Sequence, residues 1–98
     1  MNSMSEPRQA AGVFRANPNV IFRRIGDEVV LFHLGSDRFY ELNGTAARFW
    51  ELINAGNDAA QIDKQMLAEF AVDPDQLAAE AAALLNSLQR EDLISVDE

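Results

Sequence analysis

The chain contains no cysteine among its 98 residues, which excludes disulfide bonds, thiolate metal sites and thiol nucleophiles. Its single histidine, His33, excludes a site built from several histidines. No segment approaches the roughly 20 consecutive apolar residues that a membrane helix needs, and the opening residues lack the pattern of a signal segment. We therefore expect a cytoplasmic domain that uses no metal, cofactor or membrane.

The full chain has a net charge of −8, and its negative charge is concentrated in the second half. Residues 1–50 carry six arginines and five acidic residues, a net charge of +1, whereas residues 51–98 carry two basic and eleven acidic residues, a net charge of −9. A field of one sign disfavours partners of the same sign. Nucleic acid is therefore a poor partner for the second half, and a basic peptide or protein segment is a better one.

The sequence pattern of the first half of the chain predicts a tail and three short strands. Residues 1–16 are mostly polar, so we expect a flexible tail there, followed by one domain over residues 17–96. The expected strands cover residues 20–25, 28–34 and 38–42. A Gly-Asp pair between the first two favours a two-residue hairpin turn. The second strand is apolar on both faces, a pattern typical of a central strand covered on both sides. The third strand must then lie at an edge.

The second half of the chain shows a helical period and predicts three helices. Cap signals lie at Asn43, at Asp58 with Gln61, and at Asp73 before Pro74. The first helix should end near Gly56, and the third should cover residues 74–90. Three strands followed by three helices predict an α+β fold, winged-helix-like, with helices on one face of a small antiparallel sheet.

Few side chains suggest catalysis. His33 lies among apolar neighbours in a strand, which favours a structural role. The paired acidic residues fit turns, caps and solvated surface, and the glycines are scattered rather than gathered in a phosphate-binding loop. Trp50 lies on the apolar face of a helix and is expected in the core. No catalytic or metal-binding residue is therefore predicted.

Two features indicate a binding surface instead. The edge strand is aromatic, with Phe39 and Tyr40, and such an edge suits the addition of a guest strand. Covering of this edge by the N-terminal tail or by a second copy of the chain, giving a homodimer, remains an alternative. On the third helix, the core stripe of Leu77, Ala81, Leu84 and Leu88 is widened by a flank of Ala78, Ala82 and Leu85. Alanine also fills helices without any function.

These features together resemble the PqqD-like family, whose members are also called RiPP recognition elements because they bind ribosomally made precursor peptides. The resemblance covers about residues 17–94. It depends on EVVLFHLGSDRFYELNGTAARFWELI at residues 28–53, on AVDPDQ before the third helix, and on the closing Leu-Ile at residues 93–94. Their order and spacing are more specific than any one of them.

The resemblance implies a non-catalytic adaptor that binds the leader segment of a precursor peptide by strand addition and presents it to a modifying enzyme, such as a radical-SAM enzyme or a leader peptidase. The implied docking strand is Arg38, Phe39, Tyr40, Glu41 and Leu42. On the third helix we expect Ala78, Ala82 and Leu85 to line the groove, with Asp75 and Glu80 as partners for basic residues of the leader.

Three other functions are alternatives to this one. A winged-helix DNA-binding protein needs a basic recognition helix, whereas the second and third helices hold only Lys64 and Arg90. A small enzyme would need a nucleophile, metal set or cofactor loop. A scaffold that only dimerises through the edge strand would need no peptide at all.

Overall fold

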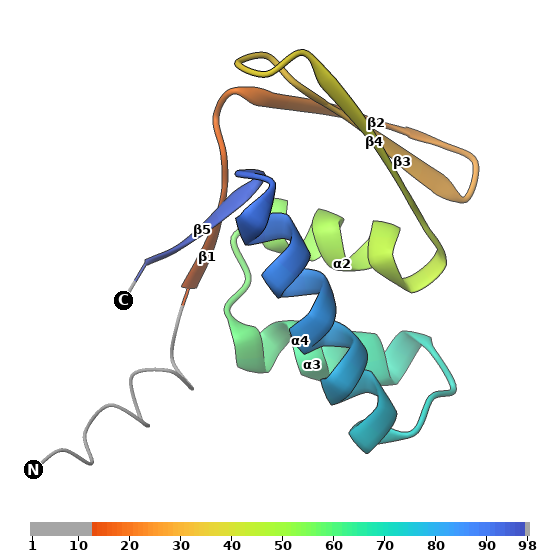
Figure 1. Ribbon diagram of the computed structural model, residues 1–98. Helices are drawn as coiled ribbons and strands as arrows, with labels where there is room; N and C mark the ends of the chain where they lie inside the picture. The colour runs from red at the N-terminus through yellow and green to blue at the C-terminus, as the bar shows by residue number, and fades with distance from the viewer. Residues whose placement is uncertain (1–12, 98) are drawn as a thin grey trace, which may run out of the picture.

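The computed structural model describes residues 13–97 as an open three-stranded sheet, a separate two-stranded ribbon and three helices. The elements are β1 (Val13–Ala16), β2 (Val20–Ile25), β3 (Glu28–His33), β4 (Arg38–Asn43), α2 (Gly44–Asn54), α3 (Ala59–Glu69), α4 (Pro74–Arg90) and β5 (Ile94–Asp97). The three helices lie below one face of the β2–β3–β4 sheet, and α4 crosses in front of α2 (Figure 1). The expected α+β fold is confirmed.

The sheet β2–β3–β4 is an antiparallel meander, and no other strand of the described residues pairs with either of its edges. Gly26, at φ 63°, and Asp27 make the predicted two-residue turn between Ile25 and Glu28, which pair directly. Side chains alternate between the two faces of a strand. The inner face, toward the helices, therefore carries Val20, Phe22, Arg24, Val29, Leu31, His33, Arg38, Tyr40 and Leu42.

The outer face of the sheet differs from the expectation for β3. Its two apolar faces predicted cover on both sides, yet no described element packs against the outer face. Val30 and Phe32 are half-buried there because neighbouring strands flank them, and Ile21, Ile25 and Phe39 are exposed. The prediction of double cover was wrong because all three helices lie on the same side of the sheet.

The ends of the described chain pair with each other, so residues 13–16 of the expected tail form a strand instead. Val13–Ala16 form β1, antiparallel to β5 at Ile94–Asp97, with Phe14 opposite Val96. Residues 1–12 lie outside the described residues. Each strand is four residues long, and its partner lies about 80 residues away in the sequence. Because local patterns carry no information about such distant pairing, neither strand was predicted.

The helix caps largely follow the sequence. Asp58 and Gln61 form the reciprocal capping box of α3, and the Asp73 carboxylate accepts two backbone N–H groups at the start of α4. Asn43 stands at the N-cap position of α2, as predicted, but its side chain makes no capping bond. The helices of the described chain are all too short or too polar to cross a membrane.

The core lies between the inner face of the sheet and the three helices. Trp50 of α2 is fully buried and meets Phe22 of β2 edge-to-face, with ring centroids 5.7 Å apart. Its indole Nε1 has no hydrogen-bond partner among the described residues. The other large, fully buried side chains are Val29, Leu31, Ile53, Ile62, Met66 and Leu93. Trp50 is therefore a core residue, as expected.

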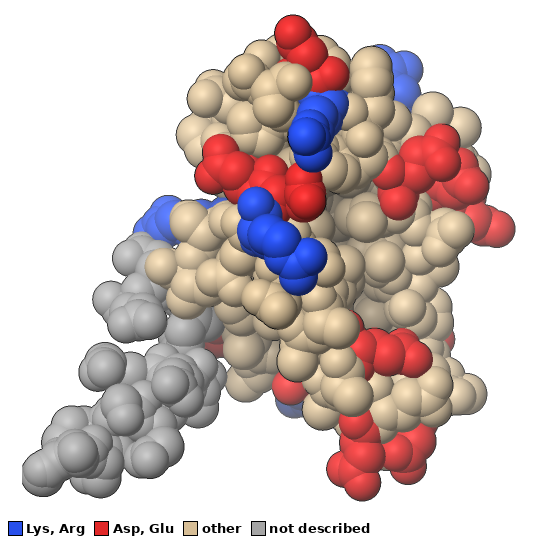
Figure 2. Space-filling view, viewed as in Figure 1, with Lys and Arg blue, Asp and Glu red and all other residues tan. Residues whose placement is uncertain are grey.

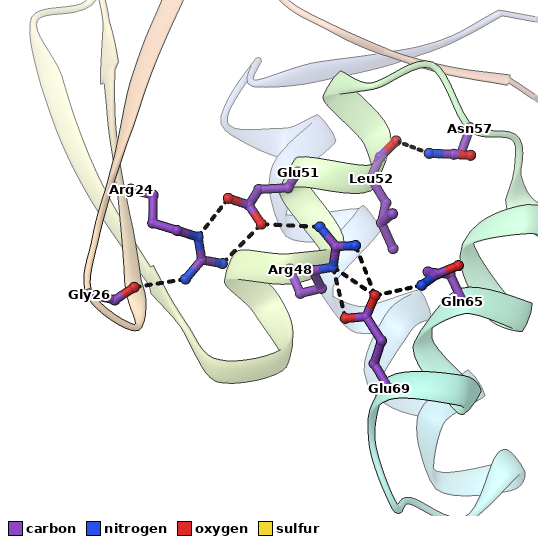
Figure 3. Close-up of polar contacts among 8 residues, drawn as sticks. All are labelled: Arg24, Gly26, Arg48, Glu51, Leu52, Asn57, Gln65 and Glu69. Carbon is purple, nitrogen blue, oxygen red and sulfur yellow. Dashed lines mark hydrogen bonds and ion pairs between the residues drawn. The ribbon is translucent and has the colours of Figure 1, made fainter.

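A chain of ion pairs connects the sheet to α2 and α3 (Figure 3). Arg24 of β2 binds both oxygens of Glu51, at 2.6 and 2.9 Å, and Arg48 binds Glu69 of α3 through two nitrogens, each 2.8 Å from the nearer oxygen. The hydrogen bond from Arg24 lowers the pKa of Glu51, and the one from Arg48 lowers the pKa of Glu69. The carboxylates thus help to hold the two layers together while they are ionised.

Candidate functional site

Strand β4 is an edge strand, as the sequence predicted, and within residues 13–97 it pairs with β3 alone. Its side chains divide between the two faces: Arg38, Tyr40 and Leu42 point inward, whereas Phe39 and Glu41 point outward. An unpaired edge leaves every second backbone N–H and C=O group free for another strand. The structure therefore brings the five predicted docking residues onto an open edge.

A groove lies between the start of α2 and α4. Thr45 and Ala46, directly after β4, form one wall, and Glu80 and Leu84 of α4 form the other. Phe49, Met66, Leu77 and Ala81 complete the lining. This lining is mainly apolar, and the Glu80 carboxylate accepts a hydrogen bond from Gln76 at 3.0 Å. A strand added to β4 would have this apolar surface beside it.

At the other end of β4, the sheet is joined to the end of α4. The Tyr40 hydroxyl donates to the Glu91 carboxylate at 2.9 Å, and Arg38 lies 3.4 Å from the same oxygen. Burial of the phenol, together with its hydrogen bond to Glu91, raises the pKa of Tyr40. A second hollow here is lined by these residues and by His33, Gly35, Ser36, Arg90 and Asp92.

The predicted helix flank of Ala78, Ala82 and Leu85 lies elsewhere. These three residues line a different hollow, together with Phe14 of β1 and Ile62 of α3. They thus face α3 and β1 rather than the groove beside β4. The structure brings only Glu80, of the predicted helix residues, into the groove with the start of α2. Asp75 is exposed in the first turn of α4.

His33 connects two loops at the end of the sheet. Its Nδ1 accepts the backbone N–H groups of Gly35 and Ser36, at 3.0 and 3.2 Å, so the ring proton lies on Nε2. Nε2 is 3.1 Å from the Asp92 carboxylate. All these contacts stabilise loops, which fits the structural role expected. Within residues 13–97, no group of three potential ligands is placed to hold a metal ion.

The charge on the molecule follows the division seen in the sequence. In the face shown in Figure 2, basic and acidic side chains are interspersed over the sheet and the upper part of the helical layer, while the lower part, over α3 and the beginning of α4, is mainly acidic. A guest lying along β4 and α4 would pass from a mixed surface toward an acidic one. This arrangement favours a guest that carries basic residues at that end.

Fold and site together define the class of protein: a small α+β domain with an open sheet edge and an apolar groove beside it, a combination suited to holding an extended peptide. A family model described as coenzyme PQQ synthesis protein D (PqqD) matches residues 28–94. The chain therefore belongs to the PqqD family, and the resemblance seen in the sequence is confirmed. No curated protein sequence matches the chain.

Two solved structures are similar to this chain over most of its length. One, described as TbiB1 in complex with the TbiA(beta) leader peptide, is 27% identical, with a TM-score of 0.79, and the match covers 83% of this chain and 94% of that one. The other, described as lasso peptide synthetase B1 complexed with the leader peptide, is 24% identical, with a TM-score of 0.74 and coverage of 84% and 96%. The second likeness shows the shared fold alone.

Apart from Glu80, sequence reasoning predicted none of the residues that line the groove, among them Thr45, Ala46 and Leu84 of its walls. Leu84 was assigned to the closed core stripe of α4, and it is indeed half-buried against the core. Thr45 and Ala46 carry no signal beyond their place directly after the edge strand. That place was itself a usable signal, because the first turn of a helix that follows an edge strand lies beside that edge.

Proposed function

We propose that this chain is a non-catalytic adaptor that binds the leader segment of a ribosomally made precursor peptide. The leader adds as a strand to β4 and places side chains in the groove between the start of α2 and α4. The observation that carries the proposal is the open β4 edge beside that groove, in a fold that matches a leader-peptide complex with a TM-score of 0.79. Strand addition would supply affinity through backbone hydrogen bonds and selectivity through the groove.

The groove supports a division of roles among its residues. Arg38, Tyr40 and Leu42 would lie under the guest strand on the inner face, and Thr45, Ala46 and Leu84 would receive its apolar side chains. Glu80 in the groove, with Asp75 at the start of α4, would attract basic residues of the leader. Ala78, Ala82 and Leu85 remain predicted contacts from the sequence, but the hollow that they line favours packing against α3.

The bound leader would be passed to a modifying enzyme in the same cytoplasmic pathway, and the family resemblance points to a radical-SAM enzyme or a leader peptidase. The chain itself would carry out no bond-making step. DNA binding gains no support, because the basic residues of α3 and α4 number only two, Lys64 and Arg90.

The test begins with a search for a short precursor gene near the gene for this chain, whose leader segment is then synthesised and titrated into the protein. Backbone amide shifts should change along β4, along the first turn of α2 and on the groove side of α4. A scrambled peptide of the same composition serves as the control. Shifts confined to the helices, with β4 unchanged, would contradict strand addition.

A further inference from the structure

The outer face of the β2–β3–β4 sheet carries a contiguous apolar surface that no described element covers. Ile21, Ile25 and Phe39 are 56%, 58% and 71% exposed, and Val30 and Phe32 lie between them on β3. Single exposed apolar side chains are ordinary, whereas a contiguous group on one face indicates an interaction surface. The groove proposed for the leader's side chains lies on the opposite side of the sheet.

This outer face has a protrusion on its β4 side and a recess on its β2 side. On the β4 side Phe39 protrudes, tilted against Phe32 with ring centroids 4.6 Å apart. On the β2 side a shallow recess is lined by Ile21, Ile25, Val30 and Phe32. A protrusion and a recess thus lie on opposite sides of the central strand.

The charges on the same face are arranged in the same way. Arg23 of β2, Val30 of β3 and Glu41 of β4 form one row across the sheet. The positive end of the row lies on the recess side and the negative end on the Phe39 side. Within residues 13–97 neither Arg23 nor Glu41 makes an ion pair, so both charges are open to a partner.

We propose that this face binds a second copy of the chain, sheet against sheet, about a two-fold axis parallel to β3. Such an axis places β2 of one copy over β4 of the other while keeping each row in register. Phe39 of each copy then meets the recess of the other, and Arg23 of each copy meets Glu41 of the other. An axis perpendicular to the strands would instead place Arg23 against Arg23, so the charges select the first arrangement.

The rest of the molecule is compatible with this dimer. Residues 51–97, with two basic and ten acidic side chains, belong to the helical layer and the ribbon on the other side of the sheet, so two sheets about 10 Å apart hold the acidic layers beyond the screening length of roughly 8 Å. Glu28 lies nearest its own counterpart, but at the solvated end of the interface. The β4 edge remains open in both copies, so peptide binding and dimer formation can coexist.

The interface is expected to be small. Three strands spaced about 4.8 Å apart and six residues long, at about 3.4 Å per residue, give a face of about 14 by 20 Å. This is less than the roughly 800 Å² per partner of a standard interface, so we expect a dissociation constant on the order of 10–100 µM.

The test is sedimentation equilibrium of the full chain from about 5 to 500 µM. The chain should dimerise in this range, and Arg23→Glu and Glu41→Arg should each weaken the dimer at least tenfold, because like charges then face each other. An equimolar mixture of these two variants should restore association to within a few-fold, because each then presents the charge that the other needs. Lys64→Glu on α3 changes the net charge as Arg23→Glu does and should leave the dimer unchanged.

Three results would overturn the proposal. These are a chain that stays monomeric throughout the range, a dimer that neither charge reversal weakens, and a mixture of folded single variants that fails to associate. Both positions are exposed, so the reversals should not unfold the chain, and circular dichroism checks this. Phe39→Ser provides a second variant without charge, and it should also weaken the dimer at least tenfold.

Discussion

The two flanks of α4 are similar in sequence and different in surroundings. Leu84 and Leu85 are adjacent, chemically identical and both half-buried. Leu84 faces the groove beside Thr45 and Ala46, whereas Leu85 faces α3 and Phe14 of β1. The width of an apolar stripe therefore shows how much of a helix is covered, but not which flank remains open to a ligand.

The difference between the flanks arises from the elements around α4. On the Leu85 side α3 and β1 come close, and β1 is already paired with β5. On the Leu84 side the neighbouring strand is β4, whose outer edge has no partner in the described chain. A guest strand can therefore be added beside one flank only.

The largest expected effect comes from exchanging the two leucines for glutamate, one at a time. Leu84→Glu places a carboxylate in the groove, which the bound leader must desolvate at a cost of about 1–3 kcal/mol. Leader affinity should then fall roughly ten- to a hundredfold, as measured by titration calorimetry.

Leu85→Glu is the matched control for that variant. The same charge on the flank turned to α3 should lower the melting temperature by several degrees and leave leader affinity within a few-fold. The reverse pattern, with affinity lost only in Leu85→Glu, would show that the sequence-based choice of flank was right and the groove assignment wrong.

A second variant tests the open edge instead of the helix. Proline lacks the N–H group that a guest strand needs, so proline at whichever of Phe39 and Tyr40 points its N–H away from β3 should spare the fold. The lost hydrogen bond of about 0.5–1.5 kcal/mol should lower leader affinity up to roughly tenfold. A folded variant with unchanged affinity would contradict strand addition.

Lowering the pH should reduce the free energy of unfolding, because it removes the ion pairs that connect the sheet to α2 and α3. The pKa values of Glu51 and Glu69 are lowered in the folded state by hydrogen bonds from Arg24 and Arg48. Their contribution to stability is therefore complete above the unfolded pKa of about 4.3 and is lost as the pH falls through the lower, folded values. Urea unfolding at pH 7 and pH 3 measures the loss, and Glu51→Gln should make it smaller. An equal loss in wild type and Glu51→Gln would show that other carboxylates cause it.

The smallest effect is expected from salt. The groove is mainly apolar and carries one acidic residue, Glu80, so raising the ionic strength should weaken leader binding only a few-fold. A loss of several orders of magnitude in the same titration would indicate a polyelectrolyte partner and contradict a guest held by backbone bonds and apolar contact.

Much of the fold was predictable because its signals are local. The Gly26-Asp27 turn, the Asp58–Gln61 capping box and the Asp73-Pro74 start of α4 each depend on residues within one turn of each other. The β4 edge was predictable as well, since nothing strand-like follows it directly. The five residues predicted to dock the leader, 38–42, therefore lie on the edge strand that the sequence predicted, and their role in binding stays a prediction.

The rest of the candidate site depends on how distant segments meet. The β1–β5 ribbon closes one flank of α4, and it joins segments about 80 residues apart in the sequence. The apolar residues of β3 gave no indication that its outer face, with Val30 and Phe32, would stay uncovered. Both outcomes are set by the positions of the helices.

The sequence by itself determined the three strands of the sheet, the three helices, their order and the open edge strand, because periodicity, caps and turns act over a few residues. The order and spacing of its motifs also indicated the family. Only the tertiary structure decided which flank of α4 faces β4 and which face of the sheet meets solvent. A helix can be rotated about its axis by 100° with a shift of one residue, and an apolar strand can be covered from either side. The choice is made by packing between segments far apart in the chain, which no local pattern records.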